Sequence, residues 1–125
     1  MRILALGAGG EMGATAAAVL AADDTVTELV VADRDHRGAA AVAGSLGPKA
    51  TALQIDATDH GALVAAMSQA DLVVNTVGPF FRFGIPILTA AIDAGCDYVD
   101  ICDDPEPTLQ MLALDERAKE AGVCA

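Results

Sequence analysis

Residues Leu4–Asp33 read LALGAGGEMGATAAAVLAADDTVTELVVAD, and this stretch decides the fold. An apolar run leads into a cluster of glycines, an alanine-rich segment follows, and a second apolar run ends at an acid. Short apolar runs predict buried strands, whereas the longer alanine-rich segment predicts a helix. The stretch therefore predicts a strand, a glycine turn, a helix and a second strand that ends at Asp33.

The same alternation continues along the rest of the chain. The predicted strands are residues 2–6, 27–32, 50–55, 71–77 and 98–102, with a sixth beginning at 122–125. The predicted helices are residues 12–22, 36–46, 59–68, 86–94 and 107–121. Strands that alternate with helices predict a parallel sheet, and continuously apolar strands fit a sheet that is covered on both faces. The fold class is therefore α/β, a Rossmann-like doubly wound parallel sheet of about six strands with helices on both faces.

Local signals support several of these boundaries. Thr58 is a candidate N-cap, and Pro86 fits the first turn of a helix. Gly95 and Gly122 fall where helices should stop. The chain of 125 residues is one domain, residues 1–125, and it stops where the sixth strand should begin. We expect an N-terminal fragment of a longer chain that lacks a second, substrate domain; the alternative is a short protein with a docked last strand.

Charge and composition exclude several classes of partner. Seven basic residues against eighteen acidic ones give a net charge of -11, which argues against binding to nucleic acid or to an anionic membrane surface. The three cysteines match no zinc or redox motif and favour a reducing cytoplasm. No apolar run approaches the length of a membrane span, and the N-terminus reads as a strand rather than a signal peptide.

The glycines after the first strand are suited to hold a pyrophosphate. Gly7, Gly9, Gly10 and Gly13 do not match G-x-G-x-x-G strictly, but Gly7, Gly10 and Gly13 give the variant G-x-x-G-x-x-G. One glycine permits the tight turn, one lets the backbone approach the anion, and one lets the helix sit close to the strand. Backbone N–H groups at the helix start then hold the negative charge.

The acid after the second strand favours a dinucleotide over a mere tight turn. Asp33 follows Gly13 at the distance at which an acid accepts hydrogen bonds from the adenosine ribose, and it favours NAD because a 2'-phosphate would meet its carboxylate. Arg34 could stack on adenine or receive a 2'-phosphate, so NADP stays open. Asp56 after the third strand is suited to the adenine amino group or, equally, to a helix cap shared with Thr58.

The ends of the fourth and fifth predicted strands should complete the site. In a doubly wound sheet the ligand lies over the carboxyl ends of strands 1 and 4, so residues 75–81 should line the nicotinamide end, with at least one of Phe80 and Phe81 packed inward. Arg82 is either a solvated loop residue or a group that attracts a substrate carboxylate. Four acids cluster around the end of the fifth strand: Asp97, Asp100, Asp103 and Asp104. A cap for the following helix explains Asp103 or Asp104 more simply than a metal site does, and Asp100 could face the candidate site. No histidine is near, and we predict no metal site.

The motifs ALGAGGEMG, VVADRD and DLVVNTVGPFFRFGIPILTAAIDAGCDYVDICDD resemble the NAD(P)-binding domain of the saccharopine dehydrogenase family over nearly the whole chain. The resemblance implies an oxidoreductase acting on C–N bonds of amino-acid-like substrates, whose second domain binds the substrate and supplies most catalytic groups. It implies that Gly7, Gly10 and Gly13 hold the pyrophosphate, and that residues 98–104 face the domain boundary.

The candidate cofactor-binding residues are Gly7, Gly9, Gly10, Glu11, Met12, Gly13, Asp33, Arg34, Asp56, Ala57, Asn75, Gly78 and Pro79. No catalytic residue is assigned. The Tyr-x-x-x-Lys pair of short-chain dehydrogenases is missing, since Cys102 stands four residues after Tyr98. The expected cofactor is NAD or NADP, with NAD preferred, and the chain could form a homodimer. The alternatives are a nucleotide-sensing regulator of potassium transport that binds NAD or ATP without catalysis, and a Rossmann module with no retained ligand.

Overall fold

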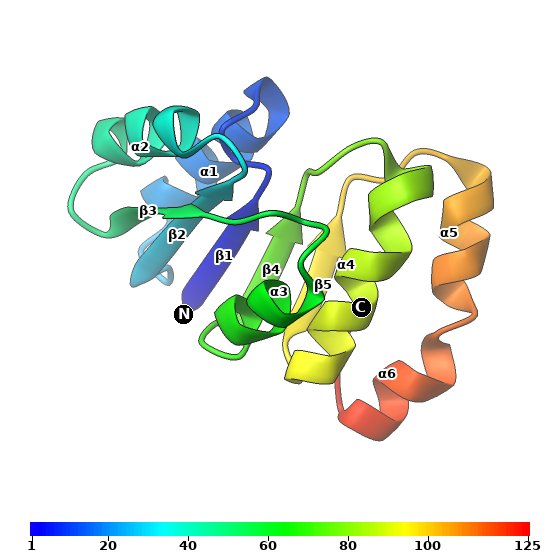
Figure 1. Cartoon of the computed structure of the whole chain (residues 1–125). Coiled ribbons are helices and arrows are strands. Elements are labelled where there is room, and N and C mark those ends of the chain that lie inside the picture. The colour runs from blue at the N-terminus through cyan, green and yellow to red at the C-terminus, as the bar shows by residue number, and fades with distance from the viewer.

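A computed structural model describes residues 1–125 as a parallel sheet with helices on both faces (Figure 1). The sheet has five strands in the order β3-β2-β1-β4-β5. The strands are β1 (Arg2–Leu6), β2 (Glu28–Asp33), β3 (Ala50–Gln54), β4 (Leu72–Asn75) and β5 (Asp97–Asp100). The helices are α1 (Glu11–Ala22), α2 (His36–Ser45), α3 (His60–Met67), α4 (Phe80–Ala94), α5 (Pro105–Leu112) and α6 (Asp115–Ala121).

Alternate residues of the central strand β1 build the core on the two faces of the sheet. Ile3 and Ala5 belong to a buried cluster that includes residues of α1 and α2. Leu4 and Leu6 belong to a second cluster that includes residues of α3, α4 and α6. Successive side chains of a strand point to opposite faces, so an all-apolar strand requires helices on both sides. The predicted doubly wound α/β fold is confirmed.

The strand order reverses between β1 and β4. The chain leaves β1 toward β2 and β3, and α3 then carries it back across the sheet to β4 (Figure 1). Leu6 at the end of β1 lies in register with Asn75 at the end of β4 and with Ala32 of β2. The segments that follow β1 and β4 therefore diverge from neighbouring points, which is where open α/β sheets bind ligands.

The prediction that Pro86 opens a helix was wrong. Helix α4 begins at Phe80, and Pro86 lies inside it. Proline has no N–H, so it cannot donate to the carbonyl of Arg82 four residues earlier. The helix continues past this missing bond because its buried face, which includes Phe80, Ile87 and Leu88, packs in the core.

The single helix predicted over residues 107–121 is two helices. The chain turns at Ala113 and Leu114 between α5 and α6, and both helices contact α4. A straight helix of this length would extend about 22 Å, so the turn lets two short helices pack against one neighbour. Leu114, partly buried against the core, anchors the turn.

Two further predictions differ from the structure. Asp59, rather than Thr58, caps α3, and its side chain accepts from Ala62 N at 2.9 Å. The predicted sixth strand is not formed. Residues 123–125 instead lie beside β5 as an irregular segment, where Tyr98 N donates to Cys124 O at 2.9 Å. None of the helices combines the length and the apolar character needed to cross a membrane.

Candidate functional site

The turn after β1 depends on glycine at two positions. Gly7 has a φ of +80°, the left-handed region that side chains disfavour, and its N–H donates to Ala32 O at 2.8 Å. A Cβ added to Gly13 would lie 2.3 Å from Gly7 O and 2.6 Å from Thr76 Oγ1. Glycine at position 13 therefore lets α1 approach the end of β1, as the sequence predicts.

Gly9 and Gly10 shape the start of α1. A Cβ on Gly9 would meet the Asp33 carboxylate at 2.9 Å, because Gly9 N donates to Asp33 Oδ2 at 3.0 Å. Gly10 is the N-cap, and Ala14 N donates the first helical bond to its carbonyl at 2.8 Å. The N–H groups of Glu11, Met12 and Gly13 precede that bond and have no partner within the helix. They form a positive end that can hold an anion.

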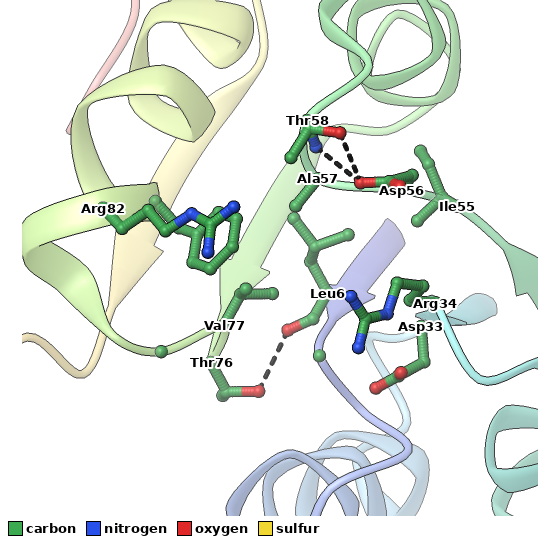
Figure 2. Close-up of a pocket in the computed structure, with 13 residues that line it drawn as sticks. Leu6, Asp33, Arg34, Ile55, Asp56, Ala57, Thr58, Thr76, Val77 and Arg82 are labelled. Carbon is green, nitrogen blue, oxygen red and sulfur yellow. Dashed lines mark hydrogen bonds between the residues drawn. The ribbon is translucent and has the colours of Figure 1, made fainter.

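A cavity of about 510 Å³ lies over the carboxyl ends of four strands (Figure 2). This is the size of a small-molecule site. It is lined by Leu6, Gly7, Asp33, Arg34, Ile55, Asp56, Ala57, Thr58, Thr76, Val77, Gly78, Arg82 and Phe83. The residues come from the ends of β1, β2 and β4, the segment after β3, and the first turn of α4, so the cavity spans the point where the strand order reverses.

Two carboxylates and two guanidinium groups set the electrostatics of the cavity. Asp56 accepts from the N–H and the hydroxyl of Thr58 at 2.8 and 2.7 Å. These bonds lower the pKa of Asp56, and the charges of Arg34 and Arg82 lower it further. Figure 2 shows the two arginines on opposite sides of the cavity. Neither guanidinium forms a hydrogen bond or salt bridge with the protein, although Arg82 lies over the Phe83 ring at 5.0 Å.

Thr76 joins the two strand ends beneath the cavity. Its hydroxyl donates to Leu6 O at 2.9 Å (Figure 2), and its N–H donates to the same oxygen at 2.9 Å. Its Oγ1 also lies 2.8 Å from the position of a Cβ on Gly7 and 2.6 Å from that of a Cβ on Gly13. The segment after β4 is therefore held against the glycine turn, and the two halves of the site have a fixed relation.

The predicted site residues divide into two groups. Those that line the cavity are Gly7, Asp33, Arg34, Asp56, Ala57 and Gly78. Gly9, Gly10, Glu11, Met12 and Gly13 form the adjoining turn and helix start. Asp33 is not a helix cap: it ends β2 and accepts from Asp35 N at 2.9 Å, and Asp35 caps α2. Asp56 does not cap α3 either, because Asp59 does.

Asn75 and Pro79 do not line the cavity. Asn75 is fully buried and bonds to Val77 N and to the hydroxyl of Tyr98. Pro79 follows a cis peptide bond from Gly78 and is the N-cap of α4. Both residues therefore shape the wall of the cavity from behind.

Three residues that line the cavity, Thr58, Arg82 and Phe83, are not among the predicted cofactor-binding residues. Arg82 lies in the first turn of α4 rather than in a loop, and it points into the cavity (Figure 2). Phe80 and Phe81 open this helix and face different directions: Phe80 is buried, whereas Phe81 is 75% exposed. This agrees with the prediction that at least one of the two rings packs inward. The spacing of residues 80, 84, 87 and 88 fits one face of a helix, and this pattern indicates a helix that begins at Phe80 and includes Arg82 and Phe83.

Two of the four acids around β5 accept local hydrogen bonds. Asp97 accepts from Cys124 N at 2.9 Å, and Asp100 accepts from the hydroxyl of Tyr98 at 2.7 Å. Asp104 stands at the N-cap position of α5 without a side-chain cap bond. No three histidine, cysteine, aspartate or glutamate side chains converge as a metal site would require. A second cavity, of about 490 Å³ and mostly apolar, lies between β5 and helices α4 to α6.

Comparison with known proteins identifies the family. The family model described as "Saccharopine dehydrogenase NADP binding domain" matches residues 3–125. A trans-acting enoyl reductase of Mycobacterium ulcerans is 33% identical over 102 residues, which are 79% of this chain and 24% of that protein. A protein of Arabidopsis thaliana named as a saccharopine dehydrogenase-like oxidoreductase is 41% identical over 71 residues, 56% of this chain and 16% of that protein.

Among solved structures, a saccharopine dehydrogenase (L-Glu forming) of Saccharomyces cerevisiae superposes with a TM-score of 0.77 and 27% identity, covering 98% of this chain and 25% of that one. The chain spans about a quarter of the length of the curated mycobacterial relatives it matches. These relatives give no support to a regulator of potassium transport. The match over residues 3–125, on a sheet with the predicted glycine turn, shows that this chain belongs to the saccharopine dehydrogenase family, as its NADP-binding domain.

Proposed function

We propose that this chain binds NAD or NADP in the cavity over the carboxyl ends of β1 and β4, as the dinucleotide-binding part of an oxidoreductase. The observation that supports the proposal is that three groups suited to a dinucleotide lie around one cavity. The glycine turn, the free N–H groups of α1 and the Asp33 carboxylate adjoin the same cavity at the reversal of strand order. The glycine turn and the N–H groups suit the diphosphate of a dinucleotide, and the carboxylate suits its adenosine ribose.

The residues present fit this cofactor. The glycine turn would lie against the diphosphate, and the N–H groups of Glu11, Met12 and Gly13 would donate to it, because they have no partner within the helix. Asp33 would accept from the adenosine ribose, and Asp56 with Ala57 would receive the adenine. Thr76, Val77 and Gly78 would form the wall at the nicotinamide, whose chemistry is to give or take a hydride.

NAD is the proposed preference. A 2'-phosphate would lie beside the Asp33 carboxylate, which stands at the edge of the cavity. Arg34 opposes this preference, since its guanidinium is unpaired in the same cavity and could receive a phosphate. Asp33 is the better placed of the two, because hydrogen bonds to Gly9 N and Asp35 N fix its carboxylate, whereas the Arg34 side chain is exposed and unbonded.

The proposed reaction is reversible oxidation of a C–N bond in an amino-acid-like substrate, with hydride transferred to or from the nicotinamide. The substrate and most catalytic groups would belong to a second domain, which accords with the quarter of the relatives' length that this chain spans. A second candidate, reduction of an enoyl group, has the names of the mycobacterial relatives in its favour. Turnover by the full-length protein with an amino-acid imine or with an enoyl thioester would separate the two reactions.

We propose that the protein is located in the cytoplasm, because the spacing of its three cysteines matches no zinc or redox motif and suits a reducing compartment.

Thermal unfolding of the chain with NAD, NADH, NADP, NADPH and ATP in turn tests the proposal. A ligand at a hundred times its dissociation constant adds about 2.7 kcal/mol of stability, which a small domain shows as a clear rise in Tm. We expect a rise with nicotinamide dinucleotides and none with ATP. Equal rises with ATP would favour the sensor, and no rise with any dinucleotide would contradict the proposal.

The variant Gly10→Leu tests whether the dinucleotide-dependent rise in Tm comes from binding at the glycine turn. A Cβ at position 10 meets nothing closer than 3.4 Å, so the variant should fold, while its side chain would block the approach of a diphosphate to the turn. We expect the dinucleotide-dependent rise in Tm to disappear. Gly44→Leu, in α2 where a Cβ meets nothing within 4 Å, is the matched control and should keep it.

A further inference from the structure

A buried polar side chain joins the wall of the candidate cavity to β5. Asn75, at the end of β4, is 0% exposed. Its Oδ1 accepts from Val77 N at 2.9 Å, and its Nδ2 donates to the hydroxyl of Tyr98 at 2.9 Å. Val77 lines the cavity, whereas Tyr98 lies on the neighbouring strand.

The bonds continue beyond Tyr98 to an ionisable group. The Tyr98 hydroxyl donates to Asp100 Oδ2 at 2.7 Å, and Asp100 Oδ1 accepts from Cys102 N at 2.9 Å. Burial raises the pKa of Tyr98 above its ordinary value, so the hydroxyl keeps its proton. The chain of bonds therefore runs from Asp100 through Tyr98 and Asn75 to Val77.

The carboxylate fixes the direction of every bond in this network. An ionised carboxylate only accepts, so the single hydroxyl proton of Tyr98 is committed to Asp100. The hydroxyl can then only accept from its other neighbour, which must be the amide nitrogen of Asn75. The amide oxygen is thereby turned to the N–H of Val77. A reversed amide would set its NH₂ group against that N–H and leave two buried donors unpaired.

We propose that Asp100 and Tyr98 are positioning residues for the dinucleotide: through Asn75 they hold the segment from Thr76 to Gly78 in the shape that forms the nicotinamide end of the cavity. The inference rests on the proposed function. Neither residue lines that cavity. Both line the second cavity beside β5, so a change of charge there reaches the cofactor site through this network.

Asp100→Asn tests the polarity of the network with little change of shape. An asparagine at position 100 can donate to Tyr98, which frees the hydroxyl proton for Asn75 and lets the amide reverse. Tyr98→Phe breaks the network independently. Asp103→Asn is the matched control, since Asp103 lies in the loop that follows Asp100, is exposed and bonds to nothing in the chain. Two quantities are measured in each variant: hydrogen exchange at the Val77 amide without ligand, and the dissociation constant of NADH or NADPH.

We expect exchange at Val77 to accelerate and dinucleotide binding to weaken, each about tenfold, in Asp100→Asn and Tyr98→Phe, but not in Asp103→Asn. Exchange at Val31, in the buried centre of β2, should not change, which separates the effect from general loosening of the fold. Wild-type values at Val77 in Asp100→Asn would overturn the inference, as would equal acceleration at Val31. A wild-type chain that binds no dinucleotide would overturn the proposed function, and exchange at Val77 would still decide whether Asp100 orders the turn.

Discussion

The Oδ2 atom of Asp33 lies 3.0 Å from the backbone nitrogen of Gly9 and accepts its hydrogen bond. The carboxylate that ends β2 therefore holds the glycine turn that ends β1. A Cβ on Gly9 would fall 2.9 Å from the Asp33 carboxyl carbon, so the close contact requires glycine. One acid thus has two tasks: it orders the proposed pyrophosphate turn, and it stands where the adenosine ribose would bind.

Asp33→Asn separates these two roles when the affinities for NADH and NADPH are compared as a ratio. Asparagine has one acceptor oxygen for the two N–H groups of Gly9 and Asp35, and this loss weakens both cofactors alike. Loss of the charge removes only the repulsion of a 2'-phosphate. We expect the preference for NADH over NADPH to fall about tenfold, measured as the ratio of their dissociation constants. The control Asp24→Asn should keep the ratio; an unchanged ratio in Asp33→Asn would remove Asp33 from cofactor selection.

Arg34→Ala should have the opposite effect on that ratio. The guanidinium is unpaired and lines the cavity beside Asp33, so it is the group that a 2'-phosphate would meet. A lost hydrogen bond between charged groups weakens binding by about 1.5–3 kcal/mol, so NADPH should lose about tenfold or more in affinity while NADH changes little. Arg37→Ala, an exposed arginine on α2, controls for the loss of one positive charge. Equal losses for both cofactors would show that Arg34 does not read the phosphate.

Gly13→Ala should destabilise the fold itself. The new methyl group would lie 2.3 Å from Gly7 O and 2.6 Å from the Cα of Ala8, which are backbone atoms that cannot move aside cheaply. Overpacking of this kind costs about 1–3 kcal/mol in the free energy of unfolding, measured by urea denaturation.

Gly44→Ala is the helical control for that variant. A Cβ at position 44 meets nothing within 4 Å, so this change should stabilise α2 by about 0.5–1 kcal/mol. Wild-type stability in Gly13→Ala would mean that α1 stands farther from β1 than the structure places it.

Cys96 should be the least reactive of the three cysteines. It is 1% exposed, and burial raises its pKa from 9.0 to about 11, with the charge of Asp97 adding to the rise. At pH 8 almost no reactive thiolate forms there. Alkylation read by mass spectrometry should therefore label the exposed Cys124 first and Cys96 only after unfolding in urea.

The same shift fixes the sign of a pH effect on stability. The folded state keeps the Cys96 proton to a higher pH than the unfolded state does. The stability that the protonated thiol contributes to the fold is therefore present below pH 9 and is lost as the pH rises toward 11. Cys96→Ser should flatten this part of the stability curve. Rapid labelling of Cys96 in the native protein at pH 8 would contradict its burial.

The sequence predicted the sheet well because its signals are local. The apolar runs of β1 and β2 can only be buried from both sides, and the positions of Gly7, Gly13 and Asp33 follow from spacing along one strand, turn, helix and strand. The candidate site follows from the same local pattern, since the topology of a parallel sheet brings those carboxyl ends together.

Features that depend on distant partners could not be read from the sequence. Asn75 finds its partner Tyr98 on the neighbouring strand, 23 residues later, so a residue expected to face the cofactor is buried behind the wall of the cavity. Pro86 carries a start signal that the apolar face of α4 overrides. The turn at Leu114 depends on both short helices packing against α4, which no local pattern between residues 107 and 121 reveals.

The most direct test of the account is a titration of the ¹⁵N-labelled chain with NADH and NADPH, followed in amide proton–nitrogen correlation spectra. We expect the largest shifts on residues 7–13, on Asp33 and Arg34, and on residues 76–78, the three segments that adjoin one cavity. Shifts confined to β5 and α5, around the second cavity, with the glycine turn unchanged, would contradict it.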